Sequence, residues 1–252
     1  MRTLARCQGR VVIIGGGPGD PELITVKGLR ALETADAILY DRLAPKGLLE
    51  NLETRALKIY VGKRPGEGLP QEEINRIMEN LACRGMTVAR LKGGDPYTYG
   101  RGEEECMYLI ERGVECIVIP GVPSYVAASA LHGVPLTSRG VSSSFAVVPG
   151  KEAPGKPDGR RVKLEEIAKS VDTLVILMGA SASAEIAERL LKVLPPETPV
   201  AIASNVSTPE AETVVTSLEG LRELGINGMV KSPAVIIVGE VVRLRDKLYR
   251  EA

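Results

Sequence analysis

Short apolar runs alternate with longer stretches of helical periodicity in the first half of the chain. Residues 11–14 are apolar and run into glycines, which is typical of a buried strand that ends in a turn. Residues 20–21 are Asp-Pro and predict a helix start, because Asp suits the N-cap and Pro the first helical position. Residues 70–73 predict another start, since acidic side chains in a first turn complement the helix dipole. The pattern predicts further strands at 37–40, 57–61, 86–91 and 114–119, and a helix over 103–112.

The second half continues the alternation after an interruption at Pro120-Gly121. A Pro-Gly pair breaks helices and strands alike, so we expect an interdomain hinge at residues 120–123. Strands that alternate with helices predict an α/β protein, here with one α/β domain over 10–119 and another over 124–250. The predicted strands of this half are 143–148, 173–178, 200–203, 212–216 and 234–238, and its predicted helices are 124–131, 184–194 and 241–250.

Composition supports a large apolar core and excludes several classes of protein. The chain has 252 residues, of which 44% are hydrophobic. No apolar run reaches the roughly 18 residues of a membrane span, and the N-terminus lacks the apolar segment of a secretory signal. We therefore expect a cytoplasmic protein without membrane contact. His132 is the single histidine, which leaves no histidine cluster for a metal.

The charges balance, with 32 Lys and Arg against 32 Asp and Glu. A net charge of zero and an aromatic content of 3% argue against a nucleic-acid binder, which usually has a basic excess and stacking side chains. A charged partner must therefore meet a local group of charges. Acidic runs such as residues 103–105 balance the loop cations in the total charge.

The four cysteines form no CxxC pair and fit no zinc or iron–sulfur spacing. We expect them to be reduced or buried thiols. Asn and Gln are scarce while Glu, Lys and Arg are common, which indicates a heat-adapted source.

Two glycine-rich loops follow predicted strands. Residues 15–20 read GGGPGD, and such a loop lets the backbone approach a ligand closely. A dinucleotide site is one interpretation, with Asp41 as the ribose-binding acid, although Pro18 lacks the N–H that would hold a pyrophosphate. Residues 90–102 read RLKGGDPYTYGRG, and so many polar groups in one strand-end loop favour a functional role.

Charged side chains lie at the ends of other predicted strands. Asp41 and Arg42 follow the second strand, and Lys63 and Arg64 follow the third. Loops at the carboxyl ends of strands are where open α/β sheets bind ligands. Cations in such loops suit carboxylate or phosphate groups. Arg139, in a turn after the hinge, adds another loop cation.

These motifs occur in one order and together resemble the tetrapyrrole methylases. They are GGGPGDPELITVKG, YDRL, VGKRPG, PQEEIN, RLKGGDPYTYGRGEEE, PGV and GVPLTSRG, between about residues 11 and 242. The GGDP segment and the YDRL and GKR motifs are more similar to the members that act on uroporphyrinogen III than to the later precorrin methylases. The resemblance implies two α/β domains with a cofactor cleft between them, in a homodimer, and no metal.

The resemblance also implies the residues of the site. Asp41 matches the family's proton acceptor and Lys63 its proton donor. S-adenosylmethionine, which leaves as S-adenosylhomocysteine, would be bound by residues at nine positions: Pro18, Gly93, Gly94, Asp95, Thr98, Pro123, Ser124, Met178 and Val206. The expected reaction places two methyl groups on uroporphyrinogen III, at C-2 and C-7, and gives precorrin-2 for siroheme or cobalamin biosynthesis.

Chemistry is consistent with this assignment. Uroporphyrinogen carries eight carboxylates, which we expect to pair with Arg42, Arg64, Arg101 and Arg139. In-line attack of a pyrrole carbon on a methyl group depends mainly on alignment, and it leaves a proton for a base to remove. Three alternatives stay open: a methylase of a later precorrin, an NAD-type oxidoreductase and a non-catalytic tetrapyrrole or cofactor sensor.

Overall fold

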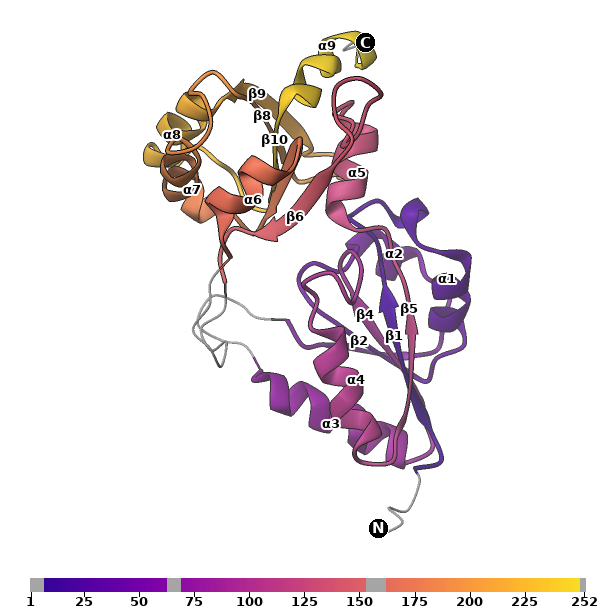
Figure 1. The fold of residues 1–252 in the computed structure, drawn as a ribbon. Coiled ribbons are helices and arrows are strands. Elements are labelled where there is room, and N and C mark those ends of the chain that lie inside the picture. Colours follow the sequence, from indigo (N-terminus) through magenta and orange to yellow (C-terminus); the bar gives the residue numbers. More distant parts are fainter. Residues whose placement is uncertain (1–6, 63–68, 153–161, 250–252) are drawn as a thin grey trace. The chain divides into compact units, whose positions relative to one another are not determined.

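The computed structural model describes residues 7–62, 69–152 and 162–249 (Figure 1). The chain divides into two compact units, Met1–Pro123 and Ser124–Ala252. Each unit contains one five-stranded sheet with helices, so the expected α/β class is confirmed. Residues 151–161 are rich in Gly, Pro and charge, which predicts a surface loop, and almost all of them lie outside the described residues.

The first unit is built on a parallel sheet with the strand order β3-β2-β4-β1-β5. Because the strands are parallel, their carboxyl ends all lie at one edge of the sheet. The pattern of apolar runs predicted each strand to within about two residues. The observed strands are β1 (Arg10–Gly15), β2 (Ala37–Tyr40), β3 (Leu57–Tyr60), β4 (Thr87–Lys92) and β5 (Glu115–Ile119).

Helices cover both faces of this sheet, which explains why its central strands are apolar on both sides. Helices α1 (Val26–Glu33) and α2 (Lys46–Asn51) pack on the face that carries Ile14 and Leu91. Helices α3 (Gln71–Cys83) and α4 (Gly102–Ile110) pack on the face that carries Ile13 and Val88 (Figure 1). Helix α2 has no counterpart in the prediction, because its six residues are too few for a periodic pattern.

The helix predicted to open at Asp20-Pro21 is in fact two elements. Asp20 caps a single 3-10 turn, η1 (Pro21–Leu23), by accepting a hydrogen bond from the Glu22 N–H over 2.8 Å. The chain then becomes extended, and Thr25 caps α1 by accepting from the Gly28 N–H. Asp20 and Thr25 are both suitable N-caps, and each caps a separate element, η1 and α1.

The second unit has a mixed sheet with the order β6-β7-β10-β8-β9. Only β6 and β7 pair in parallel; β10, β8 and β9 pair antiparallel with their neighbours. A short connection between β8 and β9 makes an antiparallel pair, since a parallel one needs a long crossover. The strands are β6 (Phe145–Pro149), β7 (Thr173–Leu177), β8 (Pro199–Ser204), β9 (Glu212–Ser217) and β10 (Ala234–Val238).

One face of this sheet packs against three helices around a core that includes Ile176, Leu190 and Leu221. The covering helices are α6 (Leu164–Ser170), α7 (Ser183–Leu190) and α8 (Leu218–Ile226); only α7 was predicted. Helix α5 (Ser124–Leu131) begins the unit and matches its prediction, and a further 3-10 turn, η2 (Ala180–Ala182), precedes α7.

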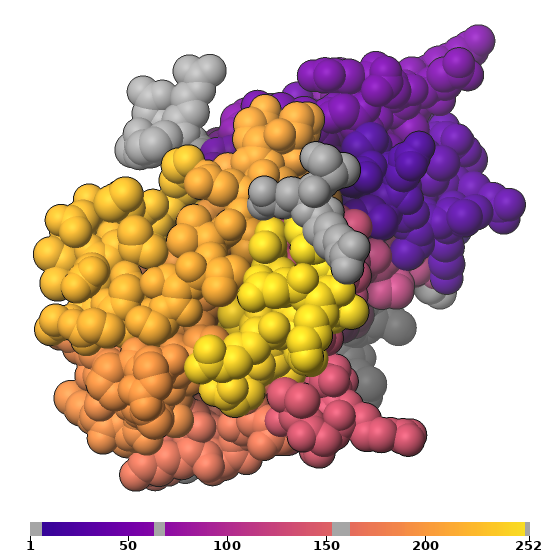
Figure 2. All heavy atoms as spheres, turned by 90° about the horizontal axis from the view of Figure 1, so that it is seen from above, coloured from indigo at the N-terminus to yellow at the C-terminus, as the bar shows by residue number. Residues whose placement is uncertain are grey.

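The C-terminal helix predicted over 241–250 is confirmed only over part of that range. The chain forms a 3-10 turn, η3 (Glu240–Leu244), and only then the short α9 (Arg245–Leu248). Val241 and Val242 are both buried within the 3-10 turn. These last residues, yellow in Figure 2, pack on their own unit: a Cβ added to Gly133 would lie 2.7 Å from Tyr249 Cβ.

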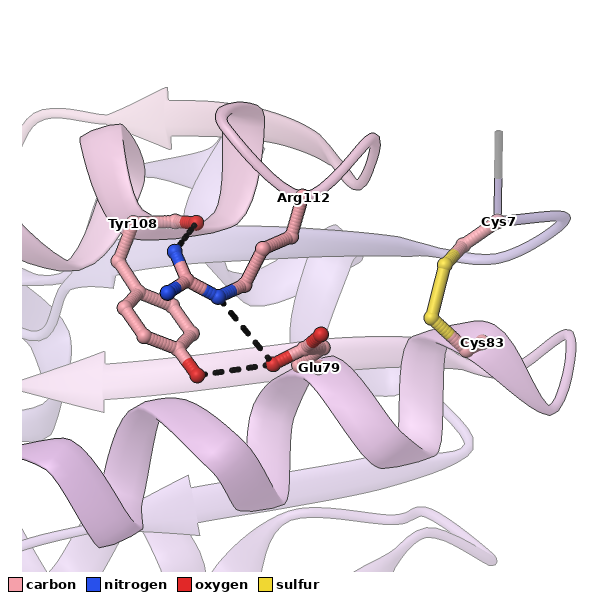
Figure 3. The surroundings of a disulfide bond; sticks show 5 residues. All are labelled: Cys7, Glu79, Cys83, Tyr108 and Arg112. Carbon is pink, nitrogen blue, oxygen red and sulfur yellow. Dashed lines mark hydrogen bonds and ion pairs between the residues drawn. A yellow bond between two sulfur atoms is a disulfide. The ribbon is translucent and has the colours of Figure 1, made fainter. Parts of the chain in front are cut away.

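The cysteines contradict the expectation of thiols. Cys7 and Cys83 form a disulfide that ties the start of the first unit to the end of α3 (Figure 3). Cys106 and Cys116 form a second, which ties α4 to β5. Pairing across 76 and 10 residues depends on the tertiary fold, so no local spacing could have shown it.

Candidate active site

Three glycine loops interlock at the carboxyl edge of the first sheet. A Cβ on Gly15 would lie 2.5 Å from Gly121 N and 2.7 Å from Gly94 O, although real Cβ atoms need more than 3 Å. Gly17 and Gly94 form an isolated antiparallel bridge, with the Gly94 N–H donating to Gly17 O over 2.6 Å. The loops after β1, β4 and β5 therefore contact one another through backbone, which only glycine allows at this separation.

Asp95 organises this loop cluster. Its Oδ1 accepts hydrogen bonds from the Tyr97 and Thr98 N–H groups, over 2.9 and 3.1 Å, and from the Thr98 hydroxyl. Its Oδ2 accepts from the Gly121 N–H over 3.2 Å, which joins the β4 loop to the β5 loop. Both oxygens of Asp95, which the resemblance assigns to the cofactor, thus accept hydrogen bonds that hold the loops together.

Strained backbone concentrates at the predicted site positions. Non-glycine residues with positive φ are uncommon and cluster where function holds the backbone in place. Two of them, Tyr99 and Arg101, follow β4, and Met178 follows β7. The others, Asn205 and Ser207, flank Val206 after β8. The positive-φ residues of the described chain, glycines aside, are thus all next to predicted site residues or are such residues themselves.

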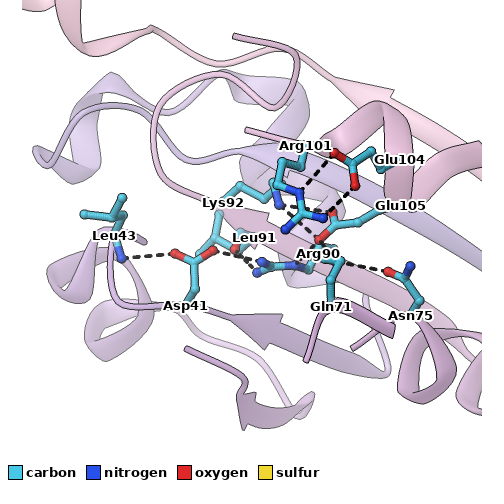
Figure 4. Close-up of polar contacts among 10 residues, drawn as sticks. All are labelled: Asp41, Leu43, Gln71, Asn75, Arg90, Leu91, Lys92, Arg101, Glu104 and Glu105. Atoms are coloured by element: carbon cyan, nitrogen blue, oxygen red, sulfur yellow. Dashed lines mark hydrogen bonds and ion pairs between the residues drawn. The ribbon is translucent and has the colours of Figure 1, made fainter. Parts of the chain in front are cut away.

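Asp41 occupies the carboxyl end of β2, between β3 and β4. Its Oδ1 accepts a hydrogen bond from the Leu43 N–H over 3.0 Å, and its Oδ2 accepts from Arg90 Nη2 over 2.8 Å (Figure 4). Its side chain stays 26% exposed. The carboxylate is held from two sides and still reaches the surface, as a base needs to.

A buried charge cluster lies beneath Asp41. Alternation along β4 places Arg90 and Lys92 on the α3 and α4 side, in line with Val88. Glu105 of α4, which is fully buried, accepts from Arg90 Nε over 3.2 Å and from Lys92 Nζ over 3.0 and 3.1 Å. Gln71 of α3 also donates to Glu105, over 3.0 Å. Burial, and next the positive charge of Arg90, lower the pKa of Lys92, while Glu105 opposes that shift.

Sequence reasoning missed this cluster. It counted residues 103–105 only as acidic groups that balance the total charge, whereas Glu105 is buried and Glu103 and Glu104 are exposed. A signal was present: Arg90 and Lys92 alternate in the apolar strand of a buried sheet, so they need an anion from a covering helix. The sequence does not say which of the three glutamates supplies it.

The predicted carboxylate-binding cations differ in availability. Arg42 and Arg139 are exposed, and neither has an ion pair with a described residue. Arg101 instead forms a two-point pair with Glu104, over 3.0 and 2.6 Å, which raises the pKa of the guanidinium. Lys63 and Arg64 lie outside the described residues.

The predicted cofactor residues fall in both units. Pro18, Gly93, Gly94, Asp95 and Thr98 lie in the loops just described, and Pro123 ends the first unit. In the second unit, Ser124 begins α5, and Met178 is 51% exposed at the end of β7. The side chain of Val206 is buried, which leaves its backbone as the part available to a ligand.

Two further features bear on the type of protein. Within residues 7–62, 69–152 and 162–249, no three His, Cys, Asp or Glu side chains are grouped as metal ligands would be. In the same residues, no helix combines the length and apolar character of a membrane span.

Comparison with known proteins identifies the family. The model of the tetrapyrrole (corrin/porphyrin) methylases matches residues 10–222. The chain is 42% identical to the uroporphyrinogen-III C-methyltransferase of Priestia megaterium, over 93% of this chain and 98% of the relative. Among solved structures it is similar to the uroporphyrin-III C-methyltransferase of Thermus thermophilus complexed with S-adenosylhomocysteine, with 41% identity, a TM-score of 0.79, and coverage of 94% and 100% of the two chains. A cobalt precorrin-4 methyltransferase has a TM-score of 0.82 but 27% identity, with coverage of 92% and 95%. The chain therefore belongs to the tetrapyrrole methylases.

Proposed function

We propose that this protein transfers two methyl groups from S-adenosylmethionine to uroporphyrinogen III, at C-2 and C-7, and releases precorrin-2 and S-adenosylhomocysteine. The observation that carries the proposal is the identity of 42%, across nearly both whole chains, with a uroporphyrinogen-III C-methyltransferase. A methylase of a later precorrin is the weaker alternative, because the cobalt precorrin-4 methyltransferase shares the fold but is only 27% identical in sequence to this chain.

The residues at the carboxyl edge fit S-adenosylmethionine. The molecule presents a carboxylate, an ammonium, a ribose and an adenine, which call for backbone polar groups and apolar contact rather than strong charge. Gly93 and Gly94 offer backbone without side chains, Thr98 a hydroxyl, and Met178 an exposed thioether at a strand end. We assign these residues to the cofactor, together with Pro18, Asp95, Pro123, Ser124 and Val206. S-adenosylmethionine supplies an electrophilic methyl group when it is bound.

The chain's own residues align the substrate and move a proton. The methylated macrocycle must lose a proton, and the Asp41 carboxylate is the acceptor in this proposal. Its two hydrogen bonds, from Leu43 and Arg90, fix its direction, and its partial exposure leaves it reachable. Lys63 is assigned as the proton donor.

Substrate carboxylates are assigned to loop arginines. Arg42 and Arg139 are exposed and ready to pair, and Arg64 is assigned with them. Arg101 must exchange its Glu104 partner for a substrate carboxylate, which costs little because both side chains are about half exposed. A neutral chain can in this way present local positive charge to a polycarboxylate.

Incubation with uroporphyrinogen III and S-adenosylmethionine tests the function. Mass spectrometry should show a product with two added methyl groups and one equivalent of S-adenosylhomocysteine per methyl. Precorrin-2 or a later precorrin as the preferred methyl acceptor would favour the alternative. Binding of NAD in place of S-adenosylmethionine by calorimetry would point to an oxidoreductase, and binding without turnover to a sensor.

We further infer a cytoplasmic homodimer that does not bind nucleic acid. Disulfides are rare in the cytosol of mesophiles but common inside hyperthermophiles, which agrees with the heat-adapted composition. Light scattering of the purified protein should give twice the chain mass of 26.9 kDa. A monomer in solution would refute the dimer.

A further inference from the structure

Glu105 anchors a chain of hydrogen bonds that reaches Asp41. The Glu105 carboxylate accepts from Arg90 Nε over 3.2 Å, and Arg90 Nη2 donates to Asp41 Oδ2 over 2.8 Å (Figure 4). The remaining nitrogen, Nη1, donates to Leu91 O over 2.9 Å. All three nitrogens of the planar Arg90 guanidinium thus donate hydrogen bonds. Because the group is rigid, the position of Glu105 helps to fix the orientation in which the guanidinium binds Asp41.

Stability does not explain why these charges are buried. Removing ions from water costs several kcal/mol per ion, and well-packed apolar residues are often as stable or more stable in their place. Val88, two residues before Arg90 on the same face, packs into an apolar cluster, so apolar residues are accommodated there. The feature that apolar residues could not reproduce is the directed contact with Asp41.

We propose that Glu105 is a positioning residue for the methyl-transfer reaction and acts on Asp41 through Arg90. Glu105 itself lies too deep to touch substrate, since its side chain has no exposed surface. The inference rests on the proposed function in one respect only: it takes Asp41 to be the proton acceptor. Lys92, the second cation paired with Glu105, balances its charge, and its hydrogen bonds among the described residues go to Glu105 and not to Asp41.

A pair of double variants separates positioning from charge balance. Lys92→Met with Glu105→Gln removes one charge of each sign and keeps an oxygen that accepts from Arg90 Nε. Lys92→Met with Glu105→Leu removes the same charges but leaves Arg90 Nε without that acceptor, while Gln71 keeps its bond to Asn75 Oδ1. Both variants retain the Arg90–Asp41 pair, so both should fold, with melting temperatures within a few degrees of each other.

We expect kcat of the Gln variant to stay within about threefold of wild type and that of the Leu variant to fall on the order of 100-fold. The dissociation constant of S-adenosylhomocysteine, measured by calorimetry, should be the same in both. Glu103→Gln, an exposed neighbour on α4, is the control and should leave kcat unchanged. Equal kcat values for the Gln and Leu variants would overturn the proposal.

A double-mutant cycle then tests the route through Asp41. In an Asp41→Asn background, the Leu variant should lower kcat no further, because Asp41 is the group that Glu105 serves. Additive losses would overturn the proposal.

A wild-type protein without methylation activity would refute the proposed function and leave the positioning of Asp41 by Glu105 through Arg90 as the part of the inference to be tested. The energetic coupling between Glu105 and Asp41 is then measured from melting temperatures. In the Lys92→Met background, the shifts caused by Asp41→Asn and Glu105→Leu should not be additive. Additive shifts in that measurement would refute it.

Discussion

The Asp95 carboxylate accepts the Gly121 N–H over 3.2 Å and so fastens the β4 loop to the β5 loop. Asp95→Asn should weaken S-adenosylhomocysteine binding about tenfold, because an amide nitrogen cannot accept this bond and the loops lose their spacing. Calorimetry measures the loss. Asp36→Asn is the matched control: the Asp36 carboxylate likewise accepts a backbone N–H, from Thr87, but where β4 begins. That change should leave affinity intact, and an equal loss there would contradict the role of Asp95.

Asp41→Asn should lower kcat by a factor on the order of 100 to 10,000, since removal of a general base costs that much. The Asn side chain has nearly the same shape as Asp, so the affinity for S-adenosylhomocysteine should not change. Asp172→Asn serves as the control, because that carboxylate accepts the N–H groups of Ser143 and Ser144 in the second unit. If steady-state kinetics give both variants the same kcat, Asp41 is not the acceptor.

Gly15→Ala should destabilise the protein, because the new Cβ would lie 2.5 Å from Gly121 N and cannot be relieved by a side-chain rotation. We expect a loss of about 2–4 kcal/mol in the free energy of unfolding by urea. Gly47→Ala should instead raise stability by about 0.5–1 kcal/mol, since Gly47 is inside α2 and a Cβ there meets only Pro21 Cγ, at 3.8 Å. A Gly15→Ala protein as stable as wild type would contradict the interlocked loops.

Reduction of the disulfides should destabilise the first unit. By loop entropy, the free energy lost is roughly 4–5 kcal/mol for Cys7–Cys83 and roughly 3 kcal/mol for Cys106–Cys116. Cys83→Ser should therefore lower the unfolding free energy more than Cys116→Ser. Hydrogen exchange in the presence of reductant should lose protection in residues 7–123 and keep it in the second unit, which has no cysteine. Unchanged protection in the first unit would mean that the cysteines are not paired.

Glu165 and Arg189 should make stability depend on pH in acid. The hydrogen bonds from Arg189 hold the pKa of Glu165 down, from 4.5 to about 2. Because the pKa is lower in the folded state, the stabilisation is complete above pH 4.5 and disappears as the pH falls toward 2. Both side chains are about 30% exposed, so screening limits the effect to about 1 kcal/mol. In urea unfolding, the free energy of unfolding of Glu165→Gln should be lower than that of wild type by this amount at pH 7 and equal to it near pH 2. A difference that stays constant with pH would exclude the ion pair as its source.

The sequence predicted the strands of the first unit because a buried strand is a local pattern of apolar residues between turns. Residues 37–40 match β2 at both ends, and 57–61 exceed β3 by one residue. The sequence pattern did not predict short helices such as α2 and α6, since six or seven residues contain fewer than two full helical periods. The start of α1 was misplaced because two capping residues compete over five positions.

The sequence by itself determined which segments carry the candidate functional residues: the glycine loops, Asp41 and the loop cations. Such residues share a strand end, and parallel strands bring their carboxyl ends to one edge, so their grouping follows from the strand pattern. Only the tertiary structure decided that Glu105 rather than Glu104 is buried and that the cysteines join. Each of these depends on which face of one element packs on another, and a local pattern carries no record of that pairing.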